Sequence, residues 1–428
     1  MTAFFISVAL IIFSFALIYV TSNKKSGMAV LLFSIYHIFF YLLPGLIHQQ
    51  QGFYPFYNLT YQASAELTAA IVVALYTCFF WLGYLLTKKR RQAPSLRQTF
   101  TAEAERRLLF VFSLIALCLF QIALVAVLGV DTFMARRSDL DREAFGQAFA
   151  VRELMLLVAR SASFACLFLA VYFRKSLNNV LLRGVIISLS AILFFIINYP
   201  LALPRFVLFS YVIFVAYFYY PMTRKNKWTI VLVSVLGITT IFPLTSHLSR
   251  GEGAFQFQFS DYYSRSGDFD GFQSTINTVL YVRKNGLEYG HQLASSALAL
   301  VPRAIWRGKA RSTGEITSAS AGYDYTNISA PLPAELYIDF GYLGVTLFSL
   351  LLGMLIATID NTSHTLTTSG SVSASRILAM ATVVSFLVII SRGPMLGAIN
   401  NVYIQILIFV GISSICRLQF KHQIANNN

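Results

Sequence analysis

Arginine is the residue type whose placement in this sequence most clearly suggests chemistry. The members of the set stand at the ends of apolar segments or in the long stretch between two of them: Arg205 after Pro204, Arg250 in LSRGEG, Arg265 in SRSGD, Arg303 in VPRAIW and Arg392 in ISRGP. A guanidinium group is always charged and presents a planar fork of donors, so it suits phosphate better than lysine does. For any one arginine alone, a side chain that extends to lipid headgroups is the better explanation. The set as a whole indicates a site for an anion.

Two arginines carry a further argument from position. Arg205 opens a predicted helix, where unpaired backbone N–H groups and the helix dipole also attract phosphate oxygens. Arg160 is predicted inside an apolar segment, about two turns from its end, where an unpaired charge is expensive. We therefore expect Arg160 to face protein or a water-filled cavity.

Carboxylates in or beside the same long stretch are candidate general bases. Asp268 and Asp270 form an Asp-x-Asp pattern in SGDFDG. Such a pattern can hold a divalent metal, but a turn with self-capping aspartates beside glycines is the favoured explanation. Glu335 stands at the start of an apolar segment, and a role beside the substrate and capping of a helix N-terminus explain it equally well. The remaining acids of this kind are Glu315, Asp324 and Asp339.

The histidines and the short motifs exclude several other chemistries. His247 and His291 are far apart and show no HxxxH or HExxH spacing, so we predict no zinc site. Either could accept a proton from a hydroxyl group, although a single histidine at a membrane surface more often has a structural role. The sequence contains no GxSxG, no Walker A motif and no GxGxxG in a strand-turn-helix setting, which argues against hydrolases and nucleotide-binding enzymes.

The elements that must position these residues are helices in a membrane. Of 428 residues, 57% are hydrophobic and only 12% charged, and the mean hydropathy is +0.65. One water-soluble core cannot hide so much apolar side chain. The apolar runs are long enough for a spanning helix, which needs about 20 residues. We predict about eleven spans, near residues 3–20, 28–47, 65–87, 108–130, 153–173, 180–198, 205–220, 228–245, 335–358, 376–391 and 396–416.

The basic residues predict the orientation of these spans. The formal net charge is +15, from 33 Lys and Arg against 18 Asp and Glu, and its placement alternates between connections. The basic connections include KKRR at 88–91, Arg174 with Lys175, and Arg417 with Lys421. Because basic connections stay in the cytoplasm, the N-terminus is predicted outside and the C-terminus inside. The charge is therefore mostly a topology signal, and we predict no nucleic-acid partner.

The longest connection, residues 246–333, falls on the outer side. It separates eight predicted spans in residues 1–245 from the last three, with a cytoplasmic tail, in residues 334–428. Apolar residues recur in it at helical spacing, as Phe272, Ile276, Val279 and Val282 and again as Leu293, Ala297, Leu300 and Val301. We expect two short helices on the outer membrane face. The fold class is thus an all-α polytopic membrane protein with a large extracytoplasmic loop.

Read in order, this connection and its flanks resemble a known family. The stretches LSRGEG, SRSGDFDGF, ALVPRAIWRGK and ISAPLPAELYIDFGYLG, within about residues 246–345, are similar to the Wzy-type polymerases of oligosaccharide repeat units, such as O-antigen units. These enzymes are related in architecture to O-antigen ligases. The resemblance implies a GT-C-like, metal-independent glycosyltransferase without a cofactor, in the bacterial cytoplasmic membrane with its N-terminus in the periplasm.

The resemblance also implies substrates, partners and roles. A growing glycan leaves its undecaprenyl diphosphate and joins the non-reducing end of a new lipid-linked repeat unit, so donor and acceptor are both lipid-linked oligosaccharides. A chain-length regulator of the Wzz type is an expected partner, as are membrane lipids. The residues expected to bind the diphosphate or donor are Arg205, Arg250, Arg265 and Arg303, with Arg392 and Arg160 in support. Those expected on the acceptor side are Glu335, Asp268 and His291.

Two other functions are weighed against this one. An O-antigen ligase passes the same donor to lipid A core, but the family's ligases usually carry a histidine late in the outer loop, and residues 292–335 contain none. A lipid-linked sugar flippase or transporter commonly has ionisable groups near the bilayer midplane and repeated halves. The sequence shows no acid at mid-span and no such repeat, so a transporter ranks below both enzymes.

Overall fold

The computed structural model describes residues 1–22, 27–57, 60–88, 98–135, 148–219, 263–366 and 371–424, with the isolated positions 237, 240 and 244. Its helices are α1 (Thr2–Ser22), α2 (Met28–Tyr36), the π-helical η1 (His37–Leu42), α3 (Leu43–Gln51), α4 (Ala63–Thr87), α5 (Arg107–Leu128), α6 (Val130–Met134), α7 (Ala148–Tyr172), the 3-10 turn η4 (Arg174–Ser176), α8 (Val180–Ile197), α9 (Arg205–Tyr219), the 3-10 turn η6 (Gly267–Phe269), α13 (Gly271–Asn285), α14 (His291–Ala297), α15 (Thr313–Ser320), α16 (Leu332–Leu366), α17 (Ala374–Arg392) and α18 (Met395–Ile415). Its strands are β1 (Gln98–Ala104), β2 (Ser371–Ser373) and β3 (Leu418–Ile424).

The described residues contain nine helices that are long and apolar enough to cross a membrane. They correspond to nine of the predicted spans, with α2, η1 and α3 forming one of them, and the shorter apolar helix Arg205–Phe218 corresponds to a tenth. The span predicted at 228–245 lies outside the described residues, apart from its isolated positions. A multi-pass, mostly helical membrane protein is therefore confirmed.

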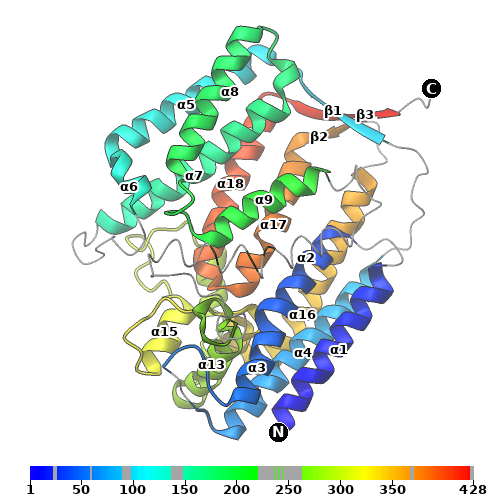
Figure 1. Ribbon diagram of the computed structural model, residues 1–428, viewed down its shortest axis with the longest axis vertical. Coiled ribbons are helices and arrows are strands. Elements are labelled where there is room, and N and C mark those ends of the chain that lie inside the picture. The colour runs from blue at the N-terminus through cyan, green and yellow to red at the C-terminus, as the bar shows by residue number, and fades with distance from the viewer. Residues whose placement is uncertain are drawn as a thin grey trace.

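The helices form a bundle in which α9, α17 and α18 lie between two outer groups (Figure 1). One group contains α1, α2, α4 and α16, and the other contains α5, α7 and α8. The contact between α4 and α16 is especially close: a Cβ on Gly353 would lie 2.0 Å from the Phe80 carbonyl oxygen, and one on Gly83 would lie 2.1 Å from that of Leu350. Membrane helices pack this way where small residues let backbones approach.

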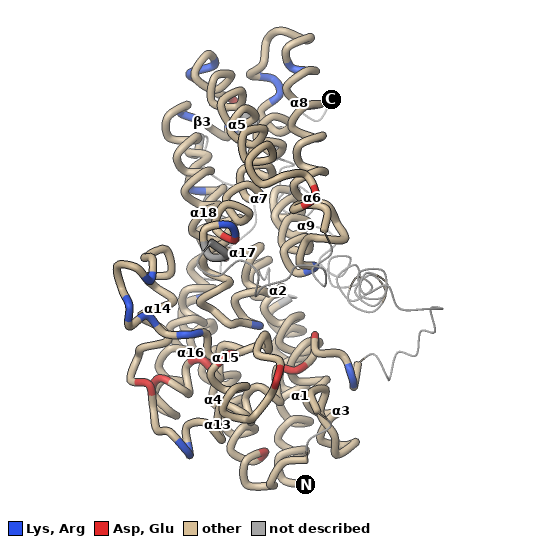
Figure 2. Tube along the Cα trace, turned by 90° about the vertical axis from the view of Figure 1, so that its left-hand side faces the viewer, with Lys and Arg blue, Asp and Glu red and all other residues tan. Residues whose placement is uncertain are grey.

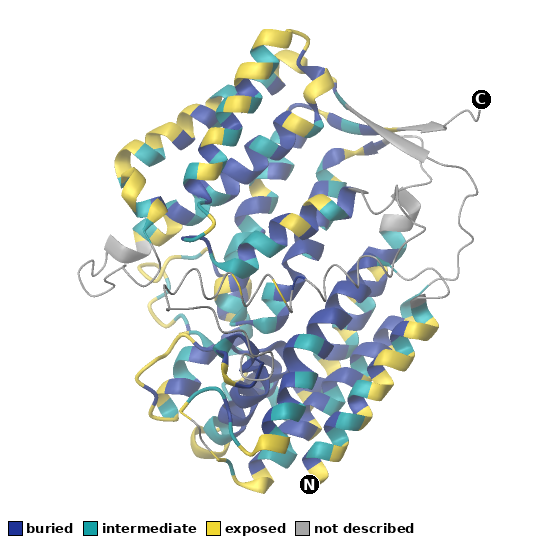
Figure 3. Cartoon of the chain, viewed as in Figure 1, coloured by how far each residue is buried: buried dark blue, intermediate teal, exposed yellow. Residues whose placement is uncertain are grey.

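Large apolar side chains are exposed on the outward sides of α1, α5 and α8, where Figure 3 shows stripes of exposed positions. Examples are Phe5, Phe15, Leu119, Phe195 and Val185. In a polytopic protein these are the surfaces that lipid covers, because no polar partner is needed there.

Helices α13 and α15, which precede α16, lie at the same end of the bundle as the N-terminus (Figure 1). The helix predicted from Phe272, Ile276 and Val279 is confirmed as α13, and all three side chains are buried. It differs from a helix lying on a membrane face, because all nine residues from Gly271 to Val279 are buried. Its polar residues are buried too, since Gln273 bonds to the Phe56 backbone and to the hydroxyl groups of two tyrosines, Tyr61 and Tyr323.

The second predicted helix is confirmed only in its first part. Helix α14 ends at Ala297, and Leu300 and Val301 belong to the turns that follow it. A further helix, α15, was not predicted; Ser312 caps it by accepting a hydrogen bond from the Glu315 N–H.

Helix α16 changes direction at Gly341, whose φ of 62° is a left-handed conformation that glycine adopts without strain.

A small antiparallel sheet at the opposite end of the bundle adds to the expected all-α fold. Its strand order is β1-β3-β2, with Ala104 opposite Leu418 and Val372 opposite Phe420. Leu418 and Phe420 are buried, and the Phe420 ring packs against Phe173. Figure 2 shows mainly basic positions at this end, and acidic and basic positions together around α13, α14 and α15. The orientation in the membrane stays a prediction.

Candidate anion site at the aspartate turn

The turn before α13, residues 266–270, is the point at which the predicted arginines and aspartates meet; we call it the aspartate turn. Ser266 caps it, because its hydroxyl oxygen accepts a hydrogen bond from the Asp268 N–H at 3.3 Å. Phe269 is fully buried and stacks on Tyr263 and Phe40. Asp270 ends the turn next to the start of α13. Buried aromatic contacts thus fix a turn that carries two carboxylates.

Arg205 meets the first carboxylate of the aspartate turn. Its Nη1 lies 3.0 Å from Asp268 Oδ2, and its Nη2 donates to Oδ1 at 3.3 Å, which is a two-pronged pair. The side chains are 19% and 9% exposed, so water reaches the pair on one side. Arg205 is the first residue of α9, as the sequence predicted, and Pro204 precedes it.

Arg392 meets the other end of the turn from the last residue of α17. Its Nη2 donates to the Gly267 carbonyl oxygen at 3.0 Å and lies 3.7 Å from Asp270 Oδ1. The guanidinium carbon also lies 4.8 Å from the ring centre of Phe206, the residue after Arg205. Within the described part of the chain, the buried Arg392 Nε has no hydrogen-bond partner. This donor could be satisfied by an anion.

Asp270 is held more deeply than Asp268. Its Oδ2 accepts hydrogen bonds from the Ser329 N–H at 2.9 Å and from the Ser274 hydroxyl at 3.3 Å. Burial raises the pKa of this carboxyl above its ordinary value, and the nearby Arg392 charge opposes that shift. Asp270 therefore anchors the turn to the segment before α16, whereas Asp268 stands at its wetter side.

The two arginines and two aspartates sum to no net charge, so an incoming anion must compete with carboxylates for the guanidinium groups. Asp268 is the partner that can be displaced, because it is the more exposed of the two and its pair is with a side chain. Among the described residues there is no cluster of three or more His, Cys, Asp or Glu side chains that could hold a metal ion.

Arg303 and His291 come together in a second place, the loop after α14. Arg303 donates to the carbonyl oxygens of Lys309 and Ala310. His291 Nε2 donates to the Gly308 carbonyl at 2.7 Å, and its Nδ1 lies 3.7 Å from a Glu288 carboxylate oxygen. The contacts of both side chains thus stabilise the loop. None of these contacts is with the aspartate turn.

The other predicted arginines are dispersed. Arg265 is exposed and lies over the ring of Phe53 at 5.9 Å. Arg160 lies within α7, near Tyr211 of α9, as expected for a charge that faces protein. Arg250 lies outside the described residues, as does His247.

Glu335 is 3% exposed, and both of its carboxylate oxygens accept hydrogen bonds. Oε1 accepts from the N–H of Met395, the first residue of α18, at 3.1 Å, and Oε2 accepts from the Thr313 hydroxyl at 2.9 Å. This is helix capping, the second explanation offered by the sequence, but the capped helix is α18 and not its own. Asp339 caps α14 in the same way, through the N–H groups of Gln292 and Leu293.

Three features of the site were missed from the sequence. Phe206 faces Arg392, the Gly267 carbonyl accepts from it, and Phe269 locks the turn. One signal was present: Phe206 follows Arg205 directly at the start of a spanning helix. The other two depend on the folded turn.

A comparison with protein families gives a match to the last quarter of the chain. Residues 319–423 match the model of the family described as O-antigen polysaccharide polymerase Wzy, a segment that holds α16, α17 and α18 with Glu335 and Arg392. Neither curated proteins nor solved structures gave a match.

Proposed function

We propose that this chain polymerises lipid-diphosphate-linked oligosaccharide repeat units, with the leaving diphosphate bound at the aspartate turn. The match of residues 319–423 to the O-antigen polysaccharide polymerase Wzy family supports this proposal. The growing glycan is the donor, and the non-reducing end of a new lipid-linked repeat unit is the acceptor. The proposal includes the finer assignments of a GT-C-like, metal-independent enzyme in the bacterial cytoplasmic membrane, with its N-terminus and the segment before α16 in the periplasm.

The observation that carries this proposal is the convergence of Arg205 and Arg392 on residues 266–270. They come from the start of α9 and the end of α17, so both lie at the ends of apolar helices, where a lipid-borne diphosphate arrives. Guanidinium groups held in place before the reaction stabilise the charge that develops on a leaving phosphate. The N-terminus of α9 adds backbone N–H groups of favourable polarity.

The transfer is a substitution at the anomeric carbon of the donor sugar. The acceptor hydroxyl oxygen forms the new bond to this carbon, the bond from the carbon to the phosphate oxygen breaks, and the diphosphate departs with the electron pair. In our proposal Arg205 turns from Asp268 to the phosphate as the donor binds. Asp268 is then available to accept the proton of the acceptor hydroxyl.

The remaining predicted residues keep secondary roles in the proposal. Two lipid diphosphates must be held at once, and Arg303, Arg265 and Arg250 are candidates for the second. His291 stays a candidate on the acceptor side, Arg160 a supporting charge, and Glu335 a positioning residue that holds the start of α18 beside Arg392. A Wzz-type chain-length regulator stays the proposed partner.

The proposal is tested with purified protein and a lipid-linked repeat unit in the presence of a metal chelator. We expect a ladder of polymer lengths on a gel from the wild type and none from Arg205→Ala or Arg392→Ala. The matched control is Arg174→Ala, an exposed arginine at the sheet end of the bundle. Wild-type ladders from both site variants would refute the assignment of the aspartate turn, and the absence of any ladder from the wild type would refute the polymerase proposal.

A further inference from the structure

The loop after α14 is a rigid unit with apolar side chains on its outside; we call residues 298–310 the α14 knob. Arg303 bonds to the carbonyl oxygens of Lys309 and Ala310, and Lys309 Nζ donates back to the carbonyl oxygens of Ala299 and Val301. The Ala310 N–H donates to the Ser295 hydroxyl, which ties the end of the knob to α14. Both cations, Arg303 and Lys309, thus bind backbone carbonyl oxygens within one short loop.

The outside of the knob is apolar. Leu298, Leu300 and Ile305 are 52%, 43% and 78% exposed. Burying such side chains away from water is worth roughly 1.5–3 kcal/mol each, so a rigid loop that presents three of them calls for a cover. Besides Arg303, the nearby exposed cations are Arg307 and Arg311. Residues 298–311 contain no Asp or Glu, although Arg311 lies 3.8 Å from a carboxylate oxygen of Glu315.

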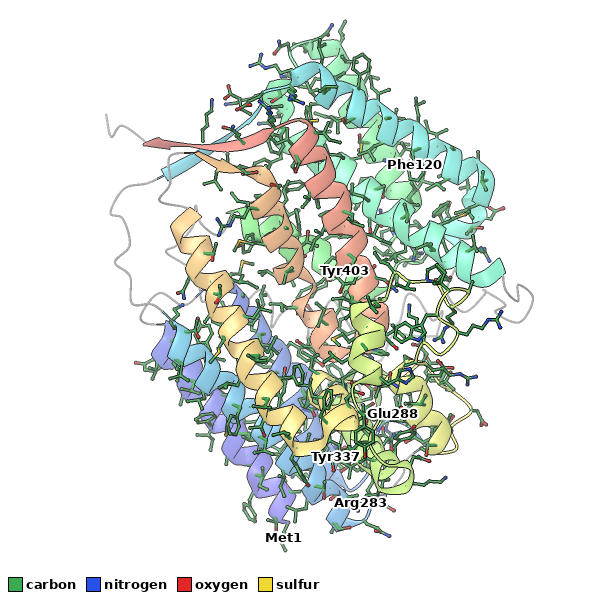
Figure 4. All side chains as sticks on the ribbon, turned by 180° about the vertical axis from the view of Figure 1, so that it is seen from behind. Met1, Phe120, Arg283, Glu288, Tyr337 and Tyr403 are labelled. Carbon is green, nitrogen blue, oxygen red and sulfur yellow. The ribbon has the colours of Figure 1, made fainter. Side chains whose placement is uncertain are left out.

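The position of the knob relative to α18 indicates what shields these apolar side chains from water. The Tyr403 hydroxyl, on the spanning helix α18, donates to the Ala297 carbonyl at the base of the knob at 3.1 Å. Tyr403 is eight residues after the first residue of α18, Met395. At about 1.5 Å per residue this is about 12 Å along the helix from its start. Figure 4 shows the loop that follows α14 beside this part of α18, where Tyr403 is labelled.

A spanning helix crosses about 30 Å of hydrocarbon, so a contact about 12 Å from its end lies at the level of the lipid. We propose that the α14 knob inserts into the outer leaflet of the bilayer, with Leu298, Leu300 and Ile305 among the acyl chains. Arg307 and Arg311 lie at headgroup level, where their charge complements lipid phosphates. The knob then fixes the segment before α16 at one height above the membrane. This inference rests on the membrane-spanning fold and, for the choice of leaflet, on the predicted orientation; it does not depend on the proposed enzymatic activity.

The test measures the surroundings of single positions in vesicles. Cys78 is the exposed native cysteine, so single cysteines are introduced into Cys78→Ser protein, as Ile305→Cys and as Lys284→Cys. Lys284 is an exposed residue in the last turn of α13 and serves as the matched control. Each is labelled with an environment-sensitive fluorophore and reconstituted into vesicles of phosphatidylethanolamine and phosphatidylglycerol.

At position 305 we expect a blue-shifted emission, several-fold stronger quenching by a lipid-borne nitroxide than at position 284, and protection from iodide placed on both sides of the vesicle. At position 284 iodide should be the better quencher. Equal iodide quenching at the two positions, without quenching by the nitroxide at 305, would overturn the proposal. Because Ile305 is largely exposed, its replacement should leave the fold intact, and Leu300→Cys gives a second reading from the same surface.

Discussion

Replacement of Asp268 by asparagine should change two properties of the protein in opposite directions. The carboxylate lies 3.0 Å from Arg205 and competes with an incoming anion, so its neutralisation should strengthen anion binding. The same carboxylate is the proposed proton acceptor, so its neutralisation should slow transfer. The variant keeps the shape of the side chain, and the cap from Ser266 to the backbone N–H of residue 268 is retained.

The size of the binding effect follows from the burial of the pair. Exposed pairs contribute about 0.2–1 kcal/mol, and unit charges at 4 Å interact by about 4 kcal/mol at an effective dielectric constant of about 20. With 19% and 9% exposure the pair lies between these limits. We expect a gain of about 1.4 kcal/mol, which is about tenfold in Kd. Loss of a general base lowers a rate by about 10²- to 10⁴-fold.

The assay titrates inorganic pyrophosphate into purified protein by calorimetry without metal, and measures polymer formation separately. Arg205→Ala should lose pyrophosphate binding, and Arg174→Ala should behave as the wild type. Asp268→Asn that binds pyrophosphate no better than the wild type would refute the competition between carboxylate and anion. An undiminished transfer rate in this variant would refute the role of Asp268 as proton acceptor.

Three further predictions concern stability and folding; the first two are measured as the thermal unfolding midpoint in detergent, and the third as the yield of folded protein. Glu335→Gln should lower the midpoint while a polymer ladder persists, because the amide keeps one acceptor oxygen and cannot accept from both the Met395 N–H and the Thr313 hydroxyl, at a typical cost of about 1–3 kcal/mol. An unchanged midpoint with no ladder would instead indicate a catalytic carboxylate. Burial raises the pKa of Asp270, so its contribution to stability is complete below the ordinary value of 3.8 and is lost as the pH rises through the folded pKa. Asp270→Asn leaves the neighbouring Arg392 and Asp268 in place and should therefore make the unfolding midpoint decrease less as the pH rises. A pH profile identical to that of the wild type would show that ionisation of Asp270 is not the cause of the decrease. Gly353→Leu should prevent the close approach of α4 and α16 and reduce the yield of folded protein, whereas Gly184→Leu, at a site with open space, should not.

Apolar length and helical spacing were sufficient to predict most of the spanning helices and α13. These signals are local: a run of apolar residues must be helical in lipid, because backbone groups find no other partner there. The small sheet escaped prediction because its strands are distant in sequence. Residues near 98–104 pair with residues near 418–424, and neither strand is apolar enough to be recognised alone.

The buried polar face of α13 shows a second limit of sequence reasoning. Gln273 and Asn277 suggest a surface facing water, yet both are buried, because Tyr61 and Tyr323 supply hydroxyl groups to them. Buried polar groups are tolerated when they are hydrogen-bonded. The two tyrosines come from loops that are more than 200 residues apart in the sequence. The spacing of apolar residues within α13 therefore cannot predict these hydrogen bonds.

At the candidate site, residue types were predicted more successfully than their partners. The sequence pointed to Arg205, Arg392 and Asp268, and these side chains do meet around one turn. It also placed Arg303 and His291 with them, whereas the structure uses both in the α14 knob and its base. A guanidinium group binds backbone carbonyls and phosphates by the same donors, so composition alone cannot separate an anion site from a braced loop.

The use of the buried carboxylates bears on how transfer proceeds at this site. Glu335 and Asp339 accept from the first N–H groups of neighbouring helices, and Asp270 accepts from the Ser329 backbone. Moving any of these would leave buried donors unpaired, which is expensive. Asp268 differs, because its ion pair is with the Arg205 side chain, which a phosphate can attract away. A site in which Arg392 is held in place, Arg205 can turn and one carboxylate can be released is organised mainly around the leaving group. Proton removal then follows diphosphate binding, since the same movement of Arg205 neutralises the phosphate and uncovers the base.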